Sequence, residues 1–528
     1  MAAGLMALGG ALMLYALRRS LVRGLVRWKL GPDRVAVNAV DTRAPLRLET
    51  PKRVAVVGAG LAGLSAATTL AARGYRVTLY DAASYIGGKV GSWPVQLGPG
   101  VTEHVSHGFH AFFRHYYNLN RFLDSLGVRQ RFKPISDYRI LLPGGSQISF
   151  DDREKTPVLN LLSMSEQGLY SLSDAFKAPT RDALGVFLEY DPEATPRQLD
   201  HLSLAELDRR ARLPPRLKMA FNTFARAFFA NEDKLSMAEL VKGFHSYYLG
   251  HAGGLVYDHP TEDYEAAFLR AVRERLSEQG VVLELSSPVA GLDYDGQRFV
   301  VRAKPYEAVV LATDVVGTRR ILGGSAGLEG LDPRLLELEP GERYAVLRLW
   351  LSEAPRQGLP SFVITERHAL LDAISFVDRC EAESARWVRE RGGSVVELHC
   401  YAVPDSFADG EVGPALLDEL KAFLPELSRA EVRYQVLQLR RDFPAFHVGK
   451  AARRPGTDTG VPGLYCAGDW VKLPFPAMLM EAAFSSGLVA ANRIFARDGL
   501  REELVESVPL RGLLAGLPQS PARKRLLA

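Results

Sequence analysis

Three glycines and one aspartate stand at a spacing that suits dinucleotide binding. Gly58, Gly60 and Gly63 follow a short β-branched segment and open an alanine-rich one, and Asp81 closes the next β-branched segment. The glycines allow a tight turn, close approach to a pyrophosphate and close helix packing, while the acid accepts hydrogen bonds from a ribose. Glycines that served only a turn would leave Asp81 unexplained. The candidate cofactor-binding residues of this motif are Gly58, Ala59, Gly60, Leu61, Ala62, Gly63 and Asp81.

The elements that must position these residues can be read from the same stretch. Residues 53–57 and 76–80 have the apolar, β-branched composition of buried parallel strands, and residues 64–73 have that of a helix, which Gly74 ends. The N-terminus of such a helix offers free N–H groups and a positive dipole end to phosphates. We therefore expect a strand–helix–strand unit that binds a dinucleotide.

A second glycine pair indicates which dinucleotide is bound. Gly87, Gly88 and Lys89 follow Asp81 closely and supply further N–H donors and a fixed positive charge for a diphosphate. The arrangement resembles the FAD-binding amine oxidase and carotenoid desaturase superfamily, which implies FAD as the cofactor. That superfamily usually carries Glu at the position of Asp81 and Arg at the position of Lys89. A lysine lacks the bidentate geometry of arginine, so the charge is kept but the geometry is not.

The late part of the chain is expected to complete the nucleotide site. Val289 follows a predicted strand and can offer backbone groups to an adenine, and Gly468 and Asp469 follow another strand. Asp469 is placed to bind a ribityl hydroxyl or, through its backbone, a phosphate. Residues 478–493 have helical spacing, and a helix start there would direct N–H groups to the N1/O2 edge of a flavin, where the reduced ring carries negative charge. The donors would belong to Met480, Glu481 and Ala482.

Two further motifs narrow the resemblance. Residues 107–113 with 116–119 are similar to the G-x-H-x-F-F segment with trailing Tyr-Asn of carotenoid desaturases. Residues 467–471 and 479–481 resemble the closing motif of the branch that contains isorenieratene-synthase-type β-carotene desaturase/methyltransferases. The likeness covers roughly residues 53–495, although its sharp motifs lie only at the two ends. It implies desaturation of a β-ionone ring coupled to methyl migration.

Four histidines lie among aromatic residues just after the nucleotide motif, at His104, His107, His110 and His115. They are compatible with a metal site, with ordinary packing, or with the lining of a flavin face and the mouth of an aromatic tunnel. We favour the tunnel, because the chain has no partner motif for a metal and a polyene can be held only by burial and stacking. No metal site is expected. His110 is the candidate catalytic residue, for orienting the substrate or accepting a proton.

Aromatic residues are also frequent in the middle of the chain, where residues 202–213, 215–230 and 235–250 have helical patterns. They either wall an apolar substrate cavity or form ordinary core, and the sequence favours neither. Neither a GxSxG motif nor a convincing nucleophile triad is present. In such a protein the flavin performs C–H oxidation and the chain positions the substrate.

Composition excludes several other classes of function. The 528 residues carry a formal charge of only +4, which gives no electrostatic support for binding nucleic acid. Three cysteines lie far apart in sequence, which argues against a disulfide framework or a zinc site and fits a reducing compartment. The positive excess lies in the first 30 residues, which contain Arg18, Arg19, Arg23, Arg27, Lys29 and no acidic residue.

The N-terminal segment, residues 1–30, is expected to associate with a membrane. Residues 1–17 are uncharged and apolar but shorter than the roughly 20 residues of a spanning helix. In the helix expected next, Arg19, Arg23 and Arg27 share one face, and Leu21, Leu25 and Trp28 another, which suits anionic headgroups. The positive charges would keep the catalytic domain cytoplasmic. Whether residues 1–17 cross the bilayer stays open, and a mobile or core-packed helix is the alternative.

The expected fold class is α/β: a discontinuous Rossmann-like FAD domain, as in glutathione-reductase-like flavoproteins, with an α+β substrate domain and an N-terminal membrane-associating helix. The FAD domain would comprise residues 53–140, 266–321 and 456–498. The substrate domain would comprise residues 141–265 and 322–455. Residues 31–52 would form a linker and residues 499–528 a C-terminal tail.

The expected function is FAD-dependent oxidation of a membrane-dissolved isoprenoid, foremost carotenoid desaturation, with or without methyl migration on a β-ring. Alternatives are carotenoid cis–trans isomerisation, amine oxidation on the same fold, and a flavin-binding scaffold without activity. The expected partners are a hydrophobic carotenoid, a membrane surface and a candidate quinone electron acceptor, but not nucleic acid.

Overall fold

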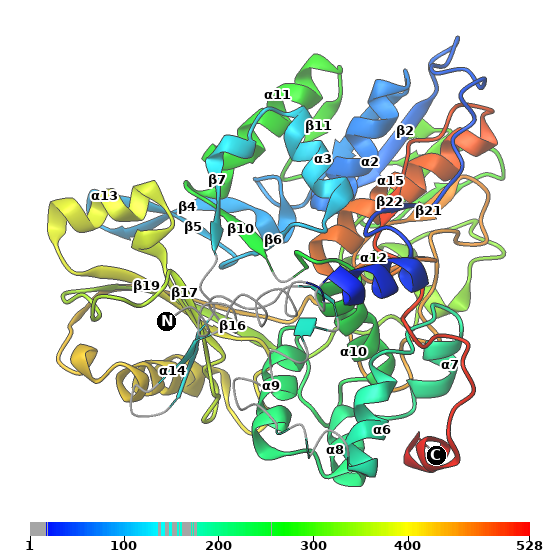
Figure 1. Ribbon diagram of the computed structural model, residues 1–528. Helices are drawn as coiled ribbons and strands as arrows, with labels where there is room; N and C mark the ends of the chain where they lie inside the picture. The colour runs from blue at the N-terminus through cyan, green and yellow to red at the C-terminus, as the bar shows by residue number, and fades with distance from the viewer. Residues whose placement is uncertain are drawn as a thin grey trace, which may run out of the picture.

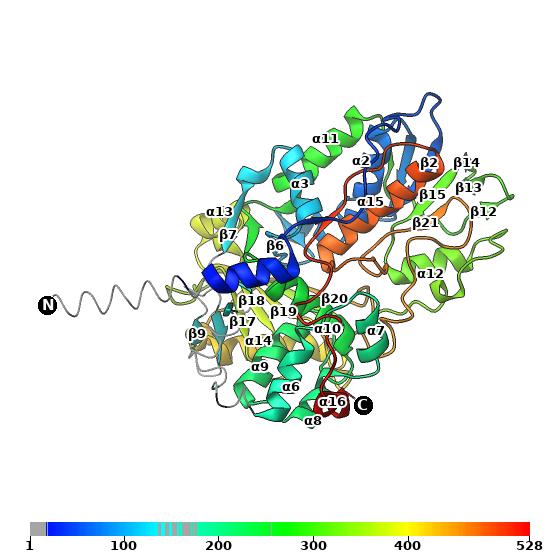
Figure 2. The ribbon, with the colours of Figure 1, turned by 45° about the vertical axis from the view of Figure 1, so that its right-hand side comes forward.

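Two large β-sheets of different kinds organise the chain (Figure 1). The structure is a computed structural model, and it describes residues 17, 20–135, 139–142, 147–149, 156–157, 159–160, 171, 173, 177–254 and 256–527. In Figures 1 and 2 the first sheet lies in the upper part of the molecule with α2 and α15, and the second lies in the lower part near α14. The helices α6 to α10 form a separate group beside the second sheet.

The first sheet has five strands in the order β11-β3-β2-β15-β21, all parallel. Its strands are rich in valine and leucine, and the three central ones are almost wholly buried, as expected when both faces of a parallel sheet are covered. The bounds are β2 Arg53–Val57, β3 Arg76–Tyr80, β11 Val282–Glu284, β15 Ala308–Leu311 and β21 Leu464–Cys466. Three segments that are distant in sequence thus build one sheet, as the discontinuous domain requires.

Helices α2 (Leu61–Ala72) and α15 (Leu479–Arg497) pack against each other on this sheet. Small residues make the close approach possible: a Cβ atom on Gly487 would lie 2.2 Å from the carbonyl oxygen of Ala62. Helix α2 begins three residues before the predicted residue 64, because the chain turns directly from Gly60 into the helix. Gly74 follows the helix with a left-handed φ of 89°.

The second sheet has seven strands in the order β20-β16-β19-β18-β17-β8-β9 and is antiparallel except between β17 and β8. Both predicted strands of this region, at 344–351 and 394–401, are present. The helix α14 (Asp409–Phe423) packs against β16, and α13 (Ala382–Arg391) lies beside β19. The bounds are β8 Arg139–Leu141, β9 Gln147–Ser149, β16 Tyr344–Leu351, β17 Phe362–Thr365, β18 Ala373–Phe376, β19 Ser394–Cys400 and β20 Val432–Arg440.

Five helices form the third group, and the three of them that were predicted, at 202–213, 215–230 and 235–250, are shorter than their sequence patterns. They are α6 Ala178–Val186, α7 Ala194–Leu199, α8 Leu204–Ala211, α9 Pro215–Arg226 and α10 Met237–Phe244. The predicted helix at 235–250 becomes a π-helix from His245 to Leu249, and Ser203 and Ser236 cap the starts of α8 and α10.

Smaller elements connect these layers. A three-stranded sheet joins β6, β10 and β7, and a second one joins β12, β13 and β14. The bounds are β4 Ser92–Gly98, β5 Val101–Ser106, β6 Phe112–Phe113, α3 Tyr117–Ser125, β7 Phe132–Ile135, β10 Tyr257–Pro260, α11 Arg270–Glu278, β12 Asp293–Tyr294, β13 Phe299–Val301, β14 Lys304–Tyr306 and α12 Val315–Gly323.

The two ends of the chain are tied together. Strand β1 (Val35–Ala36), inside the predicted linker, pairs with β22 (Glu506–Ser507), inside the predicted tail. The side chain of Arg34 forms an ion pair with Glu506. The last helix, α16 (Pro521–Leu527), packs against α6 and α8, as Figure 2 shows.

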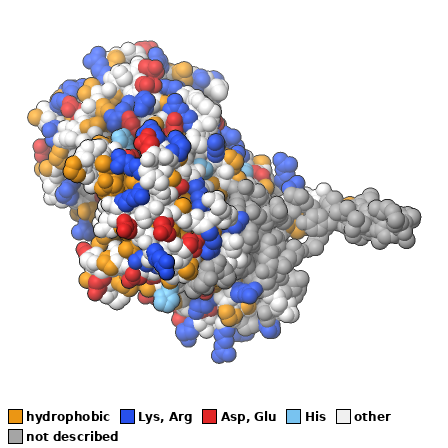
Figure 3. All heavy atoms as spheres, turned by 90° about the vertical axis from the view of Figure 1, so that its left-hand side faces the viewer, with side chains coloured by type: hydrophobic (Ala, Val, Ile, Leu, Met, Phe, Trp, Pro, Cys, Tyr) orange, Lys and Arg blue, Asp and Glu red, His pale blue; other side chains and the backbone are white. Residues whose placement is uncertain are grey.

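Residues 20–30 form a helix on the surface, drawn in dark blue in Figures 1 and 2. The side chains of Leu21 and Leu25 are each 62% exposed and that of Trp28 is 82% exposed. Residues 1–16, 18 and 19, and with them most of the predicted apolar segment, lie outside the described residues. Among the residues that are described, no helix is both long and apolar enough to span a bilayer. Elsewhere, Figure 3 shows a face on which cations, acids and apolar side chains are intermixed.

Candidate flavin and substrate site

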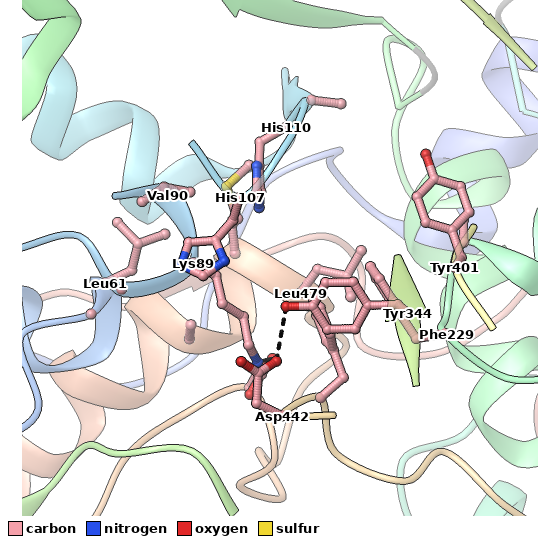
Figure 4. Close-up of a pocket in the computed structure, with 18 of the residues that line it drawn as sticks. Leu61, Lys89, Val90, His107, His110, Phe229, Tyr344, Tyr401, Asp442 and Leu479 are labelled. Atoms are coloured by element: carbon pink, nitrogen blue, oxygen red, sulfur yellow. Dashed lines mark hydrogen bonds and ion pairs between the residues drawn. The ribbon is translucent and has the colours of Figure 1, made fainter. Parts of the chain in front are cut away.

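One cavity of about 630 Å³ connects the glycine motif with the second sheet. Its lining includes most of the predicted cofactor-binding residues and His110, and Figure 4 shows Leu61, Lys89 and His110 around it. Of the predicted set, Gly58, Gly60, Leu61, Ala62, Asp81, Gly87, Gly88, Lys89, Val289, Gly468, Asp469 and Met480 line this cavity, and Ala59, Gly63, Glu481 and Ala482 do not.

The turn after β2 admits only glycine at its critical positions. Gly58 has a left-handed φ of 108°, and a Cβ atom there would lie 2.5 Å from the carbonyl oxygen of Ala312. A Cβ atom on Gly63 would lie 1.7 Å from the carbonyl oxygen of Gly58. One on Gly88 would lie 2.9 Å from the Cα atom of Gly60, so the two glycine motifs meet at the cavity. The backbone therefore reaches the cavity without side chains in the way.

Asp81 organises the loops on either side of it. One carboxylate oxygen accepts from the backbone N–H of Ala59 at 2.6 Å, and the other accepts from that of Ala83 at 2.7 Å. Burial raises the pKa of this carboxyl group, and the two backbone donors oppose that rise. Ala59 thus acts through Asp81 rather than at the cavity. Each carboxylate oxygen keeps a further lone pair for a ribose hydroxyl.

Lys89 lies among carboxylates at the entrance to the glycine motifs. Its Nζ atom is 3.5 Å from Asp469 Oδ2 and 3.9 Å from the centre of the Phe443 ring. Asp469, Asp442 and Asp314 raise the pKa of the Lys89 ammonium group, which opposes the effect of its burial. The lysine is therefore held charged beside the cavity, as the predicted contact with a diphosphate requires.

The start of α15 differs in part from the prediction. The N–H group of Ala482 donates to the carbonyl oxygen of Met478 at 3.2 Å, so it is used inside the helix and is not free for a ligand. The carboxylate of Glu481 points away from the cavity and accepts from the backbone N–H groups of Asn118 and Leu119 at the start of α3. Burial raises the pKa of Glu481 to about 7. Leu479 and Met480 are the residues of this turn that line the cavity.

The four histidines have four separate environments. His104 is 3.8 Å from Asp263, His107 Nε2 is 3.1 Å from the hydroxyl of Tyr85, and the ring of His115 packs on Tyr247. Of the four, only His107 and His110 line the cavity. Burial lowers the pKa values of His107, His110 and His115 to about 2, 4 and 3.

His110 is held in one tautomer. Its Nδ1 atom is 2.9 Å from the carbonyl oxygen of Gly108, and because a carbonyl can only accept, Nδ1 carries the proton. Nε2 is then the nitrogen with a free lone pair. Tyr264 fixes the loop by donating to the same carbonyl and by accepting from the backbone N–H of His110, both at 3.0 Å.

Aromatic side chains form the walls beyond the glycines. Phe109 stacks on Phe362 with 4.5 Å between ring centres, and Phe229 stacks on Phe443. This resolves the alternative left open for the middle of the chain: Phe221 and Phe244 are ordinary core, whereas others of that region line the cavity. The cavity-lining group comprises Phe224, Phe228, Phe229, Tyr247, Tyr248 and Tyr257.

Several lining residues escaped the sequence interpretation. Tyr344, Val346, His399, Tyr401 and Asp442 come from or beside the second sheet, and Tyr344 donates to Asp442 at 3.0 Å (Figure 4). Strands β16 and β19 are buried at every position, so no alternation marks the side that faces the cavity. A polar residue in so apolar a strand, such as His399, is the one signal that was present.

The donor set fits a dinucleotide that contains flavin. The first turn of α2 offers backbone N–H groups, Lys89 offers a cation, and Asp81 offers acceptors, all around one cavity whose glycines leave room for the ligand. The aromatic part of the same cavity can then hold a substrate against the flavin ring.

Comparisons with known proteins agree with this geometry. A family model described as flavin containing amine oxidoreductase matches residues 61–495. The chain is similar to the carotenoid phi-ring synthase of Streptomyces griseus, with 37% identity over 92% of this chain and 96% of that protein. It is also similar to the carotenoid phi-ring synthase of Chlorobaculum tepidum, with 27% identity over 89% and 92%. A putrescine oxidase solved with putrescine has a similar fold, with a TM-score of 0.60 and 15% identity over 85% of this chain and all of that one.

Proposed function

The chain belongs to the flavin containing amine oxidoreductase family, and from that premise we propose that it is a carotenoid-modifying oxidoreductase of the phi-ring synthase type. The predicted superfamily, the FAD cofactor and the enzyme class are confirmed. The finer proposal is that the substrate carries a β-ring, which is oxidised with migration of a methyl group. The relatives that are named phi-ring synthases support it.

The observation that carries the proposal is the aromatic and aliphatic part of the cavity. Phe109, Phe224, Phe362 and Tyr401 line it, together with Val346. A carotenoid has no charge to bind, so burial and stacking must supply the affinity, at about 25 cal/mol per Å² of apolar surface buried. This lining suits a polyene better than it suits a polar substrate.

The chain's own residues would orient the substrate and manage protons. The bound flavin would supply the oxidant for C–H bonds. His110, which is neutral at pH 7 and carries its lone pair on Nε2, would orient the ring or accept a proton. The stacked rings of Phe229 and Phe443 would exclude water beside Lys89.

Amine oxidation suits this cavity less well. The aromatic part of the lining that would face the substrate is apolar, and the nearby cation Arg226 is already paired with Glu232, with 2.7 Å between Nη2 and Oε1. The lining carboxylate near Arg226, Asp372, is already paired with Arg367, whose Nε lies 2.8 Å from Asp372 Oδ1. The fold that this chain shares with putrescine oxidase therefore does not imply that the two proteins share an amine substrate.

The proposal is tested by coexpressing the chain with a pathway that makes carotenes carrying β-rings. The expected result is a pigment with aromatic end rings, detected by mass and absorption spectrum, that is absent when the chain is omitted. Lys89→Met is the matched inactive variant, because it removes the cation beside the flavin site. Unchanged pigment, together with bleaching of the purified flavoprotein by a primary amine, would show that the family's amine chemistry applies instead.

We also propose that residues 20–30 rest on the lipid surface from which the substrate comes. The exposed apolar side chains of Leu21, Leu25 and Trp28 support this, and Arg23 and Arg27 add charges that suit anionic lipids. The helix lies close to the cavity wall: Arg23 donates to Thr156 at 2.9 Å, and nearby Asn160 lines the cavity. A quinone dissolved in the same membrane is the proposed electron acceptor.

Cosedimentation with vesicles tests the membrane proposal. Leu25→Glu with Trp28→Ala should release the protein from vesicles that contain anionic lipid, because both apolar anchors are lost. Leu336→Ala is the control, since Leu336 is also exposed but lies elsewhere on the surface. Equal binding of both variants would contradict the proposal.

A further inference from the structure

A second histidine, His399 on β19, lies at the cavity wall with a carboxylate beside it. Its Nε2 atom is 3.6 Å from Glu397 Oε1, and both side chains are almost fully buried, at 3% and 1% exposed. Among the described residues, neither Nε2 nor Oε1 has a hydrogen-bond partner. A small approach of the two atoms would make one hydrogen bond and satisfy both.

Glu397 and Glu381 share one cation, and burial raises the pKa of Glu381 to about 7. Arg348 pairs with Glu397 through Nη2 and Oε2 at 2.7 Å and also with Glu381 at 3.3 Å. Two carboxylates thus share one guanidinium group in the protein interior. When both carboxylates are ionised, a proton on His399 would balance the charge that Arg348 leaves uncompensated, and at low dielectric such a balance is worth more than in water.

Gly108 brings this group close to the predicted catalytic loop. A Cβ atom on Gly108 would lie 3.0 Å from His399 Cε1 and 3.2 Å from Glu397 Oε1. The carbonyl of the same glycine holds His110. The two histidines therefore lie at one part of the cavity, on the loop before β6 and on the second sheet.

We propose that His399, oriented by Glu397, is the base that accepts the proton lost by the substrate, a step that rests on the proposed function. When Nε2–H donates to Glu397 Oε1, Nδ1 carries the lone pair that takes the proton. His110 then orients the ring rather than serving as the base.

The balance of the step is that of any C–C desaturation. One C–H bond would give up a hydride, for which a bound flavin would be the oxidant. A neighbouring C–H bond gives up its proton to His399 Nδ1, and its electron pair forms the new double bond. If a methyl group migrates first, it fills the position the hydride left, and the proton is lost from the carbon next to the new cationic centre.

A carboxylate directly beside the ring suits His399 to this role, since Glu397 Oε1 lies 3.6 Å from its Nε2 atom. Burial lowers the pKa of His399, and so does Arg348, but Glu397 and Asp372 raise it. For His110, burial and the neighbouring His399 lower the pKa to about 4, whereas the hydrogen bond to Gly108 and the same Glu397 raise it. The imidazole of His399 is thus neutral before the reaction and has a carboxylate to stabilise it after proton transfer.

Chemical rescue tests the role of His399 directly. In His399→Ala, the rate of flavin reduction by the carotenoid should fall about 100-fold, the lower range for loss of a general base. Added imidazole should restore part of that rate, because the base can occupy the vacated space. His245→Ala is the matched control: His245 is buried outside the cavity with Nε2 2.6 Å from the carbonyl oxygen of Pro509, and imidazole should not rescue it. A rate in His399→Ala equal to that of the unchanged protein would overturn the proposal.

A pair of carboxylate variants tests the orientation by Glu397 without turnover. Glu397→Gln and Glu381→Gln each remove one partner of Arg348, but only Glu397 lies beside His399. In protein labelled at histidine Cε1, NMR titration should show a lower pKa of His399 in Glu397→Gln than in Glu381→Gln. Equal pKa values of His399 in both variants would contradict the proposal that Glu397 orients His399.

The two proposals fail in different ways. If the unchanged protein converts no carotenoid, the proposed function is wrong, whatever His399 does. If it converts carotenoid and His399→Gln converts it equally fast, the function stands and the assignment of the base is wrong.

Discussion

At the scale of single residues, the nucleotide motif is fixed by the space around each atom. The glycines at 58 and 63 are each within 2.5 Å of a backbone oxygen at the place where a Cβ would lie. These residues could be assigned from sequence because their roles follow from local spacing alone. His399 could not, because its role depends on Gly108 and Arg348, which other segments bring to it.

Gly63→Ala should abolish tight binding of FAD. The added Cβ would meet the Gly58 carbonyl at 1.7 Å, and overpacking of this kind costs about 1–3 kcal/mol, or roughly a 5- to 150-fold loss in affinity. Titration of the apoprotein with FAD measures it. Gly323→Ala, at a helical glycine with open space around it, is the control and should bind FAD normally. Equal affinity of the two variants would contradict the close packing of α2.

Asp81→Ala should weaken the binding of FAD more than the binding of FMN. The carboxylate is assigned to the ribose of the adenosine half, which FMN lacks, and a hydrogen bond to a charged group contributes about 1.5–3 kcal/mol. The ratio of the two affinities should therefore fall about 10- to 100-fold, as measured by fluorescence titration. An equal loss for both ligands would mean that Asp81 acts only by holding the backbone of Ala59 and Ala83.

At the scale of elements, the segment from β5 to α3 supplies both sides of the site. The loop between β5 and β6 carries His107 and His110 to the cavity, while the residues after β6 lead into α3, whose first N–H groups bind Glu481. Sequence predicted the aromatic lining but also assigned the N–H of Ala482 to the flavin, and that N–H donates within α15 instead. Periodicity locates a helix start only to within a few residues, so it does not show which N–H groups of the first turn stay free.

This segment should make the protein sensitive to mild acid. His107, His110 and His115 have pKa values well below that of an unfolded histidine, near 6.5, so stability is complete above pH 6.5 and is lost as pH falls toward 4. Each contributes about 1.4 kcal/mol per pH unit in that window. Urea unfolding between pH 7 and 5 measures the slope. His115→Gln should lower the slope of unfolding free energy against pH by about 1.4 kcal/mol per pH unit, the contribution of one histidine. An unchanged slope would contradict the burial of His115 in its neutral form.

At the scale of the whole molecule, distant segments meet in two places. The five-stranded sheet draws strands from both ends of the chain, and β1 pairs with β22 outside it. The five-stranded sheet was predictable from sequence, because each of its segments carries its own strand–loop motif. The pairing of β1 with β22 was not predictable, because strands of two residues leave no pattern in segments whose sequences are typical of a linker and a tail.

Two truncations should separate the role of the surface helix from that of the pairing between β1 and β22, the clamp that joins the two chain ends. Removal of residues 1–31 leaves β1 and should abolish vesicle binding while FAD binding and stability are kept. Removal of residues 1–38 also deletes β1, the ion pair of Arg34 and the four hydrogen bonds of Val37 and Asn38 to residues 502–505. The four bonds alone should contribute about 4 kcal/mol, at about 1 kcal/mol each. Urea unfolding compares the two. Equal midpoints would show that the clamp contributes nothing.

The position of β21 in the chain sets the order in which a newly made molecule matures. Strand β2 leaves the ribosome early, but its sheet lacks β21 until residues 464–466 have followed. At 5–20 residues per second this takes on the order of tens of seconds. Until then the glycine turn forms only part of the nucleotide site, so FAD can bind only after β21 has been made. The surface helix at residues 20–30 is made before β21, so its proposed contact with lipid would form before the chain can hold its cofactor.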